Sequence, residues 1–594
     1  MITARSWKDQ GSPERRPDAR GSYGAPAKVD QGHNAYNFHE VIPELRLRLH
    51  LLRRLAGGAA IVVLLGCLPA ARAHGQSGVD ATGGNGSAAT SVSQGRVLLV
   101  LPFDNRTGQP NLEWIREAAA NILSTRFASA GFEPTSREDR MYALDHLGLP
   151  QGFQPSRASS IKLAQMLDAD SIVVGSYTTD GTGIVAEARL VDVPQLRMLP
   201  EVSARGEMKD LIGVFGTLAW KLTRQLDPSL SVAEGTFAAA GNGVRLDAFE
   251  QYIRGITEPD QAERVRHLGL AVKLSPGFRP AWMALGREDY SGQQYQDAAA
   301  AFAKVDGNGP DGLEAEFYRG LSLLFLGDYP HAEQAFAEVA RVLPLAEVVN
   351  NEGVAVSRQG HDGTSLFIQA AAADPNTADY HFNLAVSLKR HGNSAGAAIE
   401  LAQCLKLRPN DSEALALAAE WKLPGTTASG PADLGAGADP LERIVRTFDA
   451  AAFKQAAAML DEMNARRLAA LTPRDRARTL CAQAKTYLDR GLLLEAERLY
   501  QDAVAADGNS AEAHAGLAEV RERSGDAIGA RKEAHDALES GPSANAYLVL
   551  ARLDLAAGAL HEADTEVVNA LKLEPASPEA QDLLRQILAK MGQR

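Results

Sequence analysis

The sequence has little of what metal, redox and disulfide chemistry requires. Its 594 residues include 3 cysteines with no C-x-x-C pair, and its 13 histidines are scattered along the chain. The formal net charge is −13, and no Lys/Arg stripe interleaved with aromatic residues appears, which argues against nonspecific nucleic-acid binding. We expect no cofactor and no metal, and we interpret Cys404 and Cys481 as small core residues.

Catalytic motifs are incomplete. Ser159-Ser160-Ile161-Lys162 has the S-x-x-K spacing of a serine nucleophile without the S-D-N and K-T-G motifs, and either serine is a natural helix N-cap. Gly181-Thr182-Gly183 lacks the helix that follows a phosphate-binding loop, so it indicates a hairpin turn. His561-Glu562 begins like a zinc-protease helix but has no second histidine one turn later. We predict that the protein is not an enzyme, with an unrecognised catalytic site as the remaining alternative.

The sequence also has no hydrophobic run long enough for a comfortable membrane span. The apolar run Leu55–Leu68 is short for a membrane span, follows several arginines and precedes an A-x-A site at 71–73, so residues 1–73 are predicted to be a leader with a signal peptide. Leu64-Leu65-Gly66-Cys67 resembles a bacterial lipobox, which makes Cys67 a lipidation candidate. We expect an exported protein, periplasmic or associated with the outer membrane of a bacterium. A released form and a lipid-anchored form both remain open, with an uncleaved membrane anchor as a third possibility.

The sequence does contain a regular repeat of prolines. Pro276, Pro310, Pro344, Pro375 and Pro409 follow one another at steps of 34, 34, 31 and 34 residues. Small and large residues recur in phase with these prolines. Such a period is typical of a unit that cannot bury its apolar face alone and therefore stacks on its neighbours.

The best copy of the repeat matches the pattern W-x2-L-G…A-x3-F…P with Trp282, Leu285, Gly286, Ala298, Phe302 and Pro310. It resembles the tetratricopeptide repeat, a helix–turn–helix unit, although Asp289 stands where that family usually has an aromatic residue. The resemblance implies an all-α solenoid with a concave binding face. We expect a first array at 246–422, a Gly/Pro-rich linker at 423–440, and a second array at 441–594 that starts with a helical pair over 441–471 and ends in a capping helix.

A separate domain precedes the repeats. After a tether at 74–94, rich in Gly, Ser, Ala and Thr, the stretch 95–228 is predicted to alternate strands and helices in a small α/β sandwich with a mixed sheet, followed by a linker at 229–245. The motifs Val100-Leu101-Pro102-Phe103-Asp104-Asn105 and Ala169–Ser176 make it similar to the TolB amino-terminal-like (FlgO-like) domain. That resemblance implies a fold more than an activity. We interpret Pro102 and Asn105 as strand-ending and turn-capping residues.

Counting positions within the repeats places a set of side chains on the concave face. The candidate partner-binding residues are Arg287, Tyr290, Phe317, Asn350, Phe382 and Lys389, which occupy counted positions, and Arg358 and Arg390, which lie next to counted positions. This mixed apolar and basic lining suits an extended segment with apolar anchors and an acidic group. For Phe317, Leu321 and Leu324, packing on the next repeat or on the tether is an equal alternative.

Two functions follow. The first is a non-enzymatic scaffold of the cell envelope that binds protein or peptide partners through the concave face of its repeats. The alternative is a component of an envelope export or surface-assembly machine that oligomerises through its FlgO-like domain.

Overall fold

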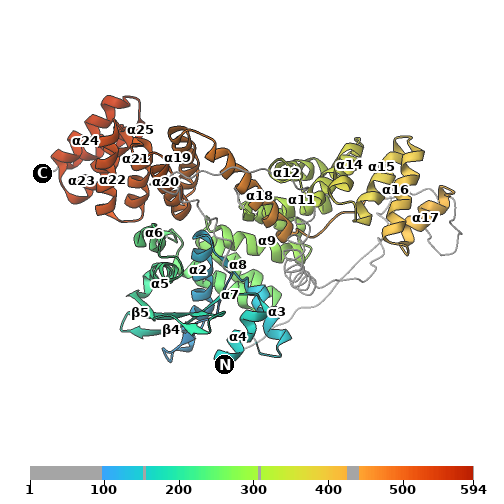
Figure 1. Cartoon of the computed structure of the whole chain (residues 1–594), viewed down its shortest axis with the longest axis horizontal. Helices are drawn as coiled ribbons and strands as arrows, with labels where there is room; N and C mark the ends of the chain where they lie inside the picture. The colour runs from blue at the N-terminus through green and yellow to red at the C-terminus, as the bar shows by residue number, and fades with distance from the viewer. Residues whose placement is uncertain (1–96, 151–155, 242, 306–309, 424–440, 593–594) are drawn as a thin grey trace, which may run out of the picture.

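The computed structural model describes residues 97–150, 156–241, 243–305, 310–423 and 441–592 (Figure 1). The predicted leader with Cys67, the predicted tether and positions 424–440 of the predicted linker lie outside the described residues. Among the helices of the described ranges, none is both long and apolar enough to span a membrane.

A mixed sheet of seven strands opens the described chain. The strands are β1 (Val97–Val100), β2 (Asp104–Asn105), β3 (Glu133–Pro134), β4 (Ser171–Asp180), β5 (Gly183–Asp192), β6 (Arg197–Met198) and β7 (Val202–Glu207). Parallel pairs join β1 to β3 and β4, and β2 to β4, whereas β5 pairs antiparallel with β4, β6 and β7. The β4–β5 turn places Gly181 at φ +62°, as the hairpin prediction requires.

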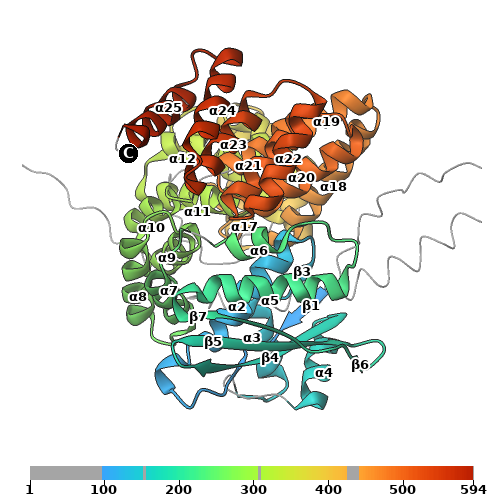
Figure 2. The same ribbon diagram turned by 90° about the vertical axis from the view of Figure 1, so that its left-hand side faces the viewer.

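Helices cover both faces of this sheet (Figure 2). They are α2 (Ile115–Ser129) and α5 (Leu211–Leu226) on one face, and α3 (Arg137–His146) and α4 (Arg157–Met166) on the other. Successive strand residues alternate between the two cores, so Leu98 packs with α2 and α5 while Leu99 packs with α3 and α4. The N-cap of α4 is Ser156, which accepts a hydrogen bond from the amide of Ser159, so the N-cap prediction at Ser159 or Ser160 is wrong.

The two motifs behind the TolB-like resemblance meet in the core. Phe103 is fully buried and its ring lies 5.5 Å from that of Phe215. A Cβ on Gly175 would lie 2.3 Å from the Phe103 ring, so the glycine makes room for the phenylalanine. Asn105 accepts hydrogen bonds from the backbone and side chain of Thr107, as the turn-cap interpretation requires. These residues therefore hold the domain together, and the relation to that family stays a prediction.

Two arrays of antiparallel helix pairs follow. The first contains α7 (Leu246–Thr257), α8 (Gln261–Leu274), α9 (Arg279–Ser291), α10 (Tyr295–Phe302), α11 (Pro310–Leu326), α12 (Tyr329–Val342), α13 (Ala346–Arg358), α14 (Thr364–Ala373), α15 (Ala378–Arg390), α16 (Ser394–Leu407) and α17 (Ser412–Glu420). The second contains α19 (Pro473–Asp489), α20 (Leu493–Ala506), α21 (Ala511–Arg523), α22 (Ala527–Ser540), α23 (Ala544–Ala557), α24 (Leu560–Leu573) and α25 (Pro578–Met591). The predicted fold class is confirmed.

The recurring spacing of small and large residues has a direct steric reason. A Cβ on Gly286 would lie 2.8 Å from the ring of Phe302, and a Cβ on Gly320 would lie 2.8 Å from that of Phe336. Each glycine thus lets the second helix of its pair press an aromatic ring against the backbone of the first.

The stretch between the arrays differs from the prediction. Instead of a helical pair over 441–471, the structure has Leu441–Asp449 without regular secondary structure and one helix, α18 (Ala450–Ala469). Figure 1 shows α18 lying between the two arrays. The pairing of helices resumes only at α19 and α20.

The α/β domain contacts both arrays. Its core continues through Phe249 and Ile253 of α7 into α8 and α9, and reaches Leu494 of α20. Part of the predicted linker 229–245 forms helix α6 (Glu234–Ala239), whose Thr236 hydroxyl bonds the fully buried carboxyl group of Glu497. The described residues 229–241 are therefore a packed connection rather than a loose one.

Candidate binding surface

Leu441–Asp449, called the docked segment below, lies against the first helices of successive repeats. Its contacts come from α11, α13 and α15 and from the start of α17. We call the residues of these helices that contact it the docking surface. The segment makes the kind of contacts that a bound peptide makes, because side chains of the array satisfy its backbone.

Asparagines clamp the backbone of the docked segment. Asn383 donates to the carbonyl of Arg443 (2.7 Å) and accepts from its amide (2.6 Å). Asn351 makes the same pair of bonds with Val445, at 2.8 and 2.9 Å, and Asn350 adds a bond of 3.1 Å to the carbonyl of Arg443. Residues 443 and 445 thus face the same side, which is the two-residue period of an extended chain. All three asparagines are fully buried beneath the docked segment. They also bond one another, since Asn383 donates to Asn350 (2.8 Å) and Asn350 donates to Asn351 (3.2 Å), so the three side chains form one network that ends on the backbone of the segment.

The carboxylate of Glu442 occupies a basic pocket. Its side chain is 1% exposed, and Arg358 bonds it at 3.2 Å while Arg390 and Ser357 bond its other oxygen. Arg358 also donates to the carbonyl of Glu442. Burial alone would raise the pKa of Glu442, but the Ser357 hydrogen bond, the backbone and the charge of Arg390 hold that pKa below its usual value.

The next residue carries the opposite charge into an acidic pocket. The Arg443 guanidinium bonds Asp379 at 2.8 Å, Asp411 at 2.7 Å and Glu413 at 3.0 Å. It also lies 3.6 Å from the centre of the buried Phe382 ring. Burial lowers the pKa of Arg443, but the bonds to Asp411 and Asp379 outweigh it and raise the pKa above its usual value.

An aromatic anchor ends the docked segment. The Phe448 ring is 9% exposed and lies 5.4 Å from that of Phe317 on α11 and 5.0 Å from that of Phe453 on α18. All three belong to the core of the first array. Arg446 lies over the ring of Phe325, 5.2 Å from its centre.

Five of the eight predicted residues contact the docked segment. They are Asn350, Arg358, Arg390, Phe382 and Phe317. Of the others, Arg287 pairs with Glu314, Lys389 lies over the ring of Trp421, and Tyr290 packs among Tyr295, Tyr318 and Phe325. Their binding to a separate partner stays a prediction.

The apolar residues Phe317, Leu321 and Leu324 are buried. All three belong to the core of the first array, the alternative that their sequence also allowed. Phe317 does both things, because its ring contacts Phe336 within its own repeat and Phe448 of the docked segment.

Sequence reasoning missed Asn351 and Asn383, which hold the backbone. Each lies one residue after a position that the repeat count assigned to the concave face. A signal was present, because asparagine is uncommon in the middle of a helix, where it competes with the backbone for hydrogen bonds. The acidic residues Asp379, Asp411 and Glu413 were missed as well.

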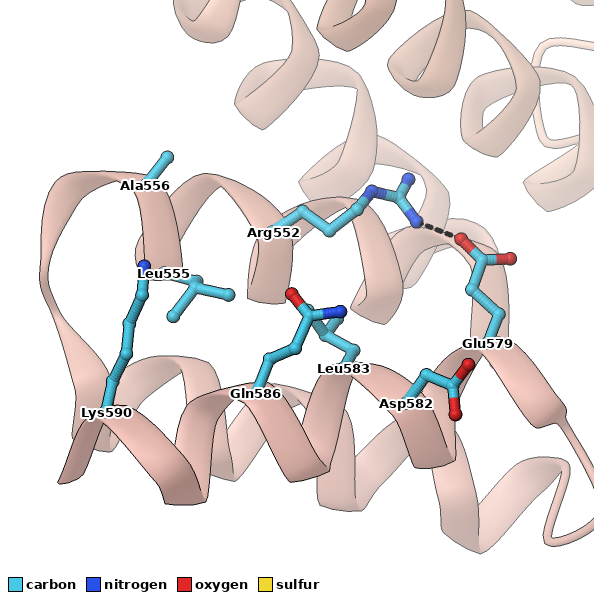
Figure 3. A pocket seen from close by; sticks show the side chains of 8 residues that line it. All are labelled: Arg552, Leu555, Ala556, Glu579, Asp582, Leu583, Gln586 and Lys590. Atoms are coloured by element: carbon cyan, nitrogen blue, oxygen red, sulfur yellow. Dashed lines mark hydrogen bonds and ion pairs between the residues drawn. The ribbon is translucent and has the colours of Figure 1, made fainter. Parts of the chain in front are cut away.

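The second array has an open cavity of about 620 Å³ between α23 and α25. Figure 3 shows Arg552 directed toward Glu579, with Asp582, Gln586 and Lys590 along the facing helix. Arg552 bonds Glu522 at 2.6 Å and Glu579 at 2.5 Å, so its charge is already paired. A second cavity of about 360 Å³ lies where α2 meets α7 and α8, lined by Glu113, Arg254 and His267 among others.

His514, Glu533 and Asp536 place potential metal ligands within 4.8 Å of one another. Their atoms have other partners, because His514 bonds Glu533 and the carbonyl of Gly508, while Lys532 bonds Asp536. His381 repeats this geometry with Glu400 and the carbonyl of Pro375. The recurrence at the same repeat position indicates a structural bond between the two helices and the preceding loop.

Both described cysteines are buried, as predicted. Burial raises the pKa of the Cys404 thiol to about 11 and that of the Cys481 thiol to about 12. Neither is therefore a thiolate at neutral pH.

Comparisons with known proteins agree on the repeats. Residues 283–345, 358–412 and 481–545 match the family model described as tetratricopeptide repeat. Among solved structures, MamA from Desulfovibrio magneticus RS-1 is 22% identical, covering 28% of this chain and 99% of that one, with a TM-score of 0.26. YrrB, described as a TPR protein with an unusual peptide-binding site, is 15% identical, covering 33% of this chain and 95% of that one, with a TM-score of 0.26.

One further solved structure is similar to part of the chain. The C-terminal domain of LpoB from Escherichia coli is 23% identical, covering 19% of this chain and 84% of that one, with a TM-score of 0.18. No curated protein matches the sequence. The matched stretches fall in both helical arrays, and the chain therefore contains tetratricopeptide repeats on either side of α18.

Proposed function

We propose that this protein is a non-enzymatic scaffold of the bacterial cell envelope that binds protein or peptide partners through its docking surface. The observation that carries the proposal is the row of buried asparagines. Asn351 and Asn383 direct both the donor and the acceptor of their amides at the backbone of an extended chain. Side chains in this arrangement recognise the main chain of a peptide, and the charged pockets on either side select its sequence.

The test is a cross-linking pull-down with the tagged, exported full-length chain from the envelope fraction. The variant N351A/N383A removes the backbone clamp, and the control E338A/R341A removes an exposed ion pair on α12, on the second helix of a repeat. We expect a discrete partner that the control retains and the clamp variant loses. Equal recovery of that partner by the clamp variant would contradict the proposal.

The same experiment separates the alternative function. A component of an export or surface-assembly machine that oligomerises through its α/β domain should recover mainly copies of itself, in wild type and clamp variant alike. Anchoring needs its own measurement, because the candidate for lipidation is Cys67 in the predicted leader. If this cysteine carries a lipid, C67A should move the protein from the membrane fraction to the soluble periplasmic fraction.

A further inference from the structure

We propose that Leu441–Asp449 is an internal ligand, which occupies the docking surface until a partner peptide of the same chemistry displaces it. This inference rests on the proposed function, because it names the partner and the regulation of the same surface. The docked segment covers five of the eight residues that the sequence assigned to partner binding.

The docked segment is bound as a ligand is bound and not as a part of the repeat stack. Residues 441–449 form no helix or strand. The amide and carbonyl groups of Arg443 and Val445 bond to asparagine side chains of α13 and α15. A repeat helix satisfies these groups internally. The asparagine amides therefore bond a backbone that belongs to no repeat helix.

The contacts define what the partner must offer. The first requirement is a carboxylate, which pairs with Arg358 and Arg390 as Glu442 does. The residue after it must be a cation, which fits between Asp379 and Asp411 as Arg443 does. The opposite signs of neighbouring pockets fix the register and direction of the peptide, since a shift by one residue would place like charges together.

Further along, the partner needs an extended backbone and an aromatic side chain. The clamp of Asn351 contacts only the backbone of Val445, while the Val445 side chain packs against the core of the first array, so position 445 favours an extended residue with an apolar side chain. Phe448 then fills a site among aromatic rings of the first array, with Phe317 at 5.4 Å. The expected partner is an extended peptide with an acidic residue, a basic residue directly after it, and an aromatic residue five positions after the basic one.

Displacement reaches beyond the docking surface. The docked segment continues directly into α18, and Phe453 of α18 is buried against Phe448. A partner that takes the place of Phe448 therefore removes one of the contacts that hold the start of α18 against the first array. Partner binding and the position of α18 are thus coupled.

The experiment uses the labelled peptide Leu-Glu-Arg-Ile-Val-Arg-Thr-Phe-Asp, blocked at both ends, and measures its binding to full-length chains by fluorescence anisotropy. The wild type is compared with the open variant E442A/R443A/F448A, whose own segment has lost its anchors. A tethered ligand has an effective concentration of about a millimolar, so a peptide with a dissociation constant of about 100 µM should bind the open variant about tenfold more tightly. A scrambled peptide should bind neither chain.

Equal affinity for wild type and open variant would overturn the inference, since it would show that the docked segment does not compete. Failure of the open variant to bind, with circular dichroism and thermal unfolding unchanged, would overturn it as well. Adding N351A/N383A to the open variant should abolish binding of the peptide. A concentration-dependent dimer of the wild type that the open variant cannot form would instead assign the docked segment to a second copy of the chain.

These outcomes are distinct from a failure of the proposed function. If the envelope partner is captured equally by wild type and open variant, the internal-ligand inference is wrong and the scaffold proposal stands. If neither chain captures a partner that depends on Asn351 and Asn383, the scaffold proposal fails. The peptide measurement decides in either case whether the docked segment competes for the surface.

Discussion

Replacing Glu442 with alanine should loosen the docked segment without unfolding the repeats. The carboxylate is 1% exposed, and its partners Arg358 and Arg390 are 20% and 26% exposed. Removing one partner of a fully buried ion pair costs about 3–5 kcal/mol. Because water reaches both arginines once the carboxylate is gone, we expect a smaller loss of about 2 kcal/mol for this pair.

The loss should appear as local opening. The amides of Arg443 and Val445 donate to asparagine side chains, so they exchange with solvent only when the docked segment leaves the surface. If the free energy of opening falls by about 2 kcal/mol, these amides should exchange about 30-fold faster. Hydrogen exchange read by mass spectrometry on peptides that cover 441–449 measures this change directly. Peptides from α21 and α23 of the second array serve as an internal reference.

Two results would refute the reasoning. Unchanged exchange over 441–449 in E442A would show that the ion pairs of Glu442 do not hold the docked segment. Exchange that rises equally throughout the first array would show that the change destabilises the repeats as a whole. The control E338A removes one partner of an exposed pair on α12 and should leave exchange over 441–449 as in the wild type.

The remaining predictions concern pH, packing and thiol reactivity. Since the folded-state pKa of Glu442 is lowered, its stabilisation is present above the usual value of about 4.5 and is lost as pH falls through the lowered pKa; urea unfolding of wild type and E442Q should therefore converge in acid, and a constant difference would contradict this. Gly175→Ala brings a Cβ to 2.3 Å from an aromatic ring and should destabilise the protein by about 1–3 kcal/mol in thermal unfolding, whereas Gly269→Ala, in open space within α8, should be neutral or stabilising by up to about 1 kcal/mol; equal effects would argue against this packing. Because burial raises the thiol pKa of Cys404 and Cys481, both should react with Ellman's reagent only on unfolding. The measurement uses C67A, which lacks the third cysteine, and rapid reaction of this native variant would contradict the burial of the other two.

The sequence predicted the repeats well because their period depends on local sterics. Gly286 and Phe302 must occupy fixed places for two helices to pack closely, so the pattern recurs wherever the unit does. Two strands were predictable from short apolar stretches, since Val97–Val100 and residues 172–174 at the start of β4 lie between two helical layers.

The docked segment was predicted to be helical but is extended, because its apolar residues fit both patterns. Leu441, Ile444, Val445 and Phe448 have the spacing of one apolar helix face. The β-branched residues Ile444, Val445 and Thr447 favour an extended backbone instead. Periodicity cannot decide between the two, because the asparagines that fix the extended form lie about 60 to 94 positions earlier in the sequence.

The sequence predicted the basic residues of the candidate site but not the segment that binds to them. Arg358 and Arg390 lie next to repeat positions that were expected on the concave face, and an acidic partner was inferred from their charge; in the structure both bond Glu442. That Glu442 of the same chain is the acid could not be inferred, because the predicted linker before it gives no indication of the path the chain takes.

The placement of helix α6 has a mechanical consequence. The α/β domain holds the first array through α7 and α9 and the second array through the contact of Thr236 with Glu497, while the docked segment and α18 join the two arrays directly. The three bodies thus form a closed ring of contacts. Releasing the docked segment would leave the two contacts with the α/β domain intact, so we expect the angle between the arrays to change while both stay attached to that domain. Binding of a peptide should therefore change the angle between the two arrays. Cross-linkers of fixed length between the arrays could measure this change.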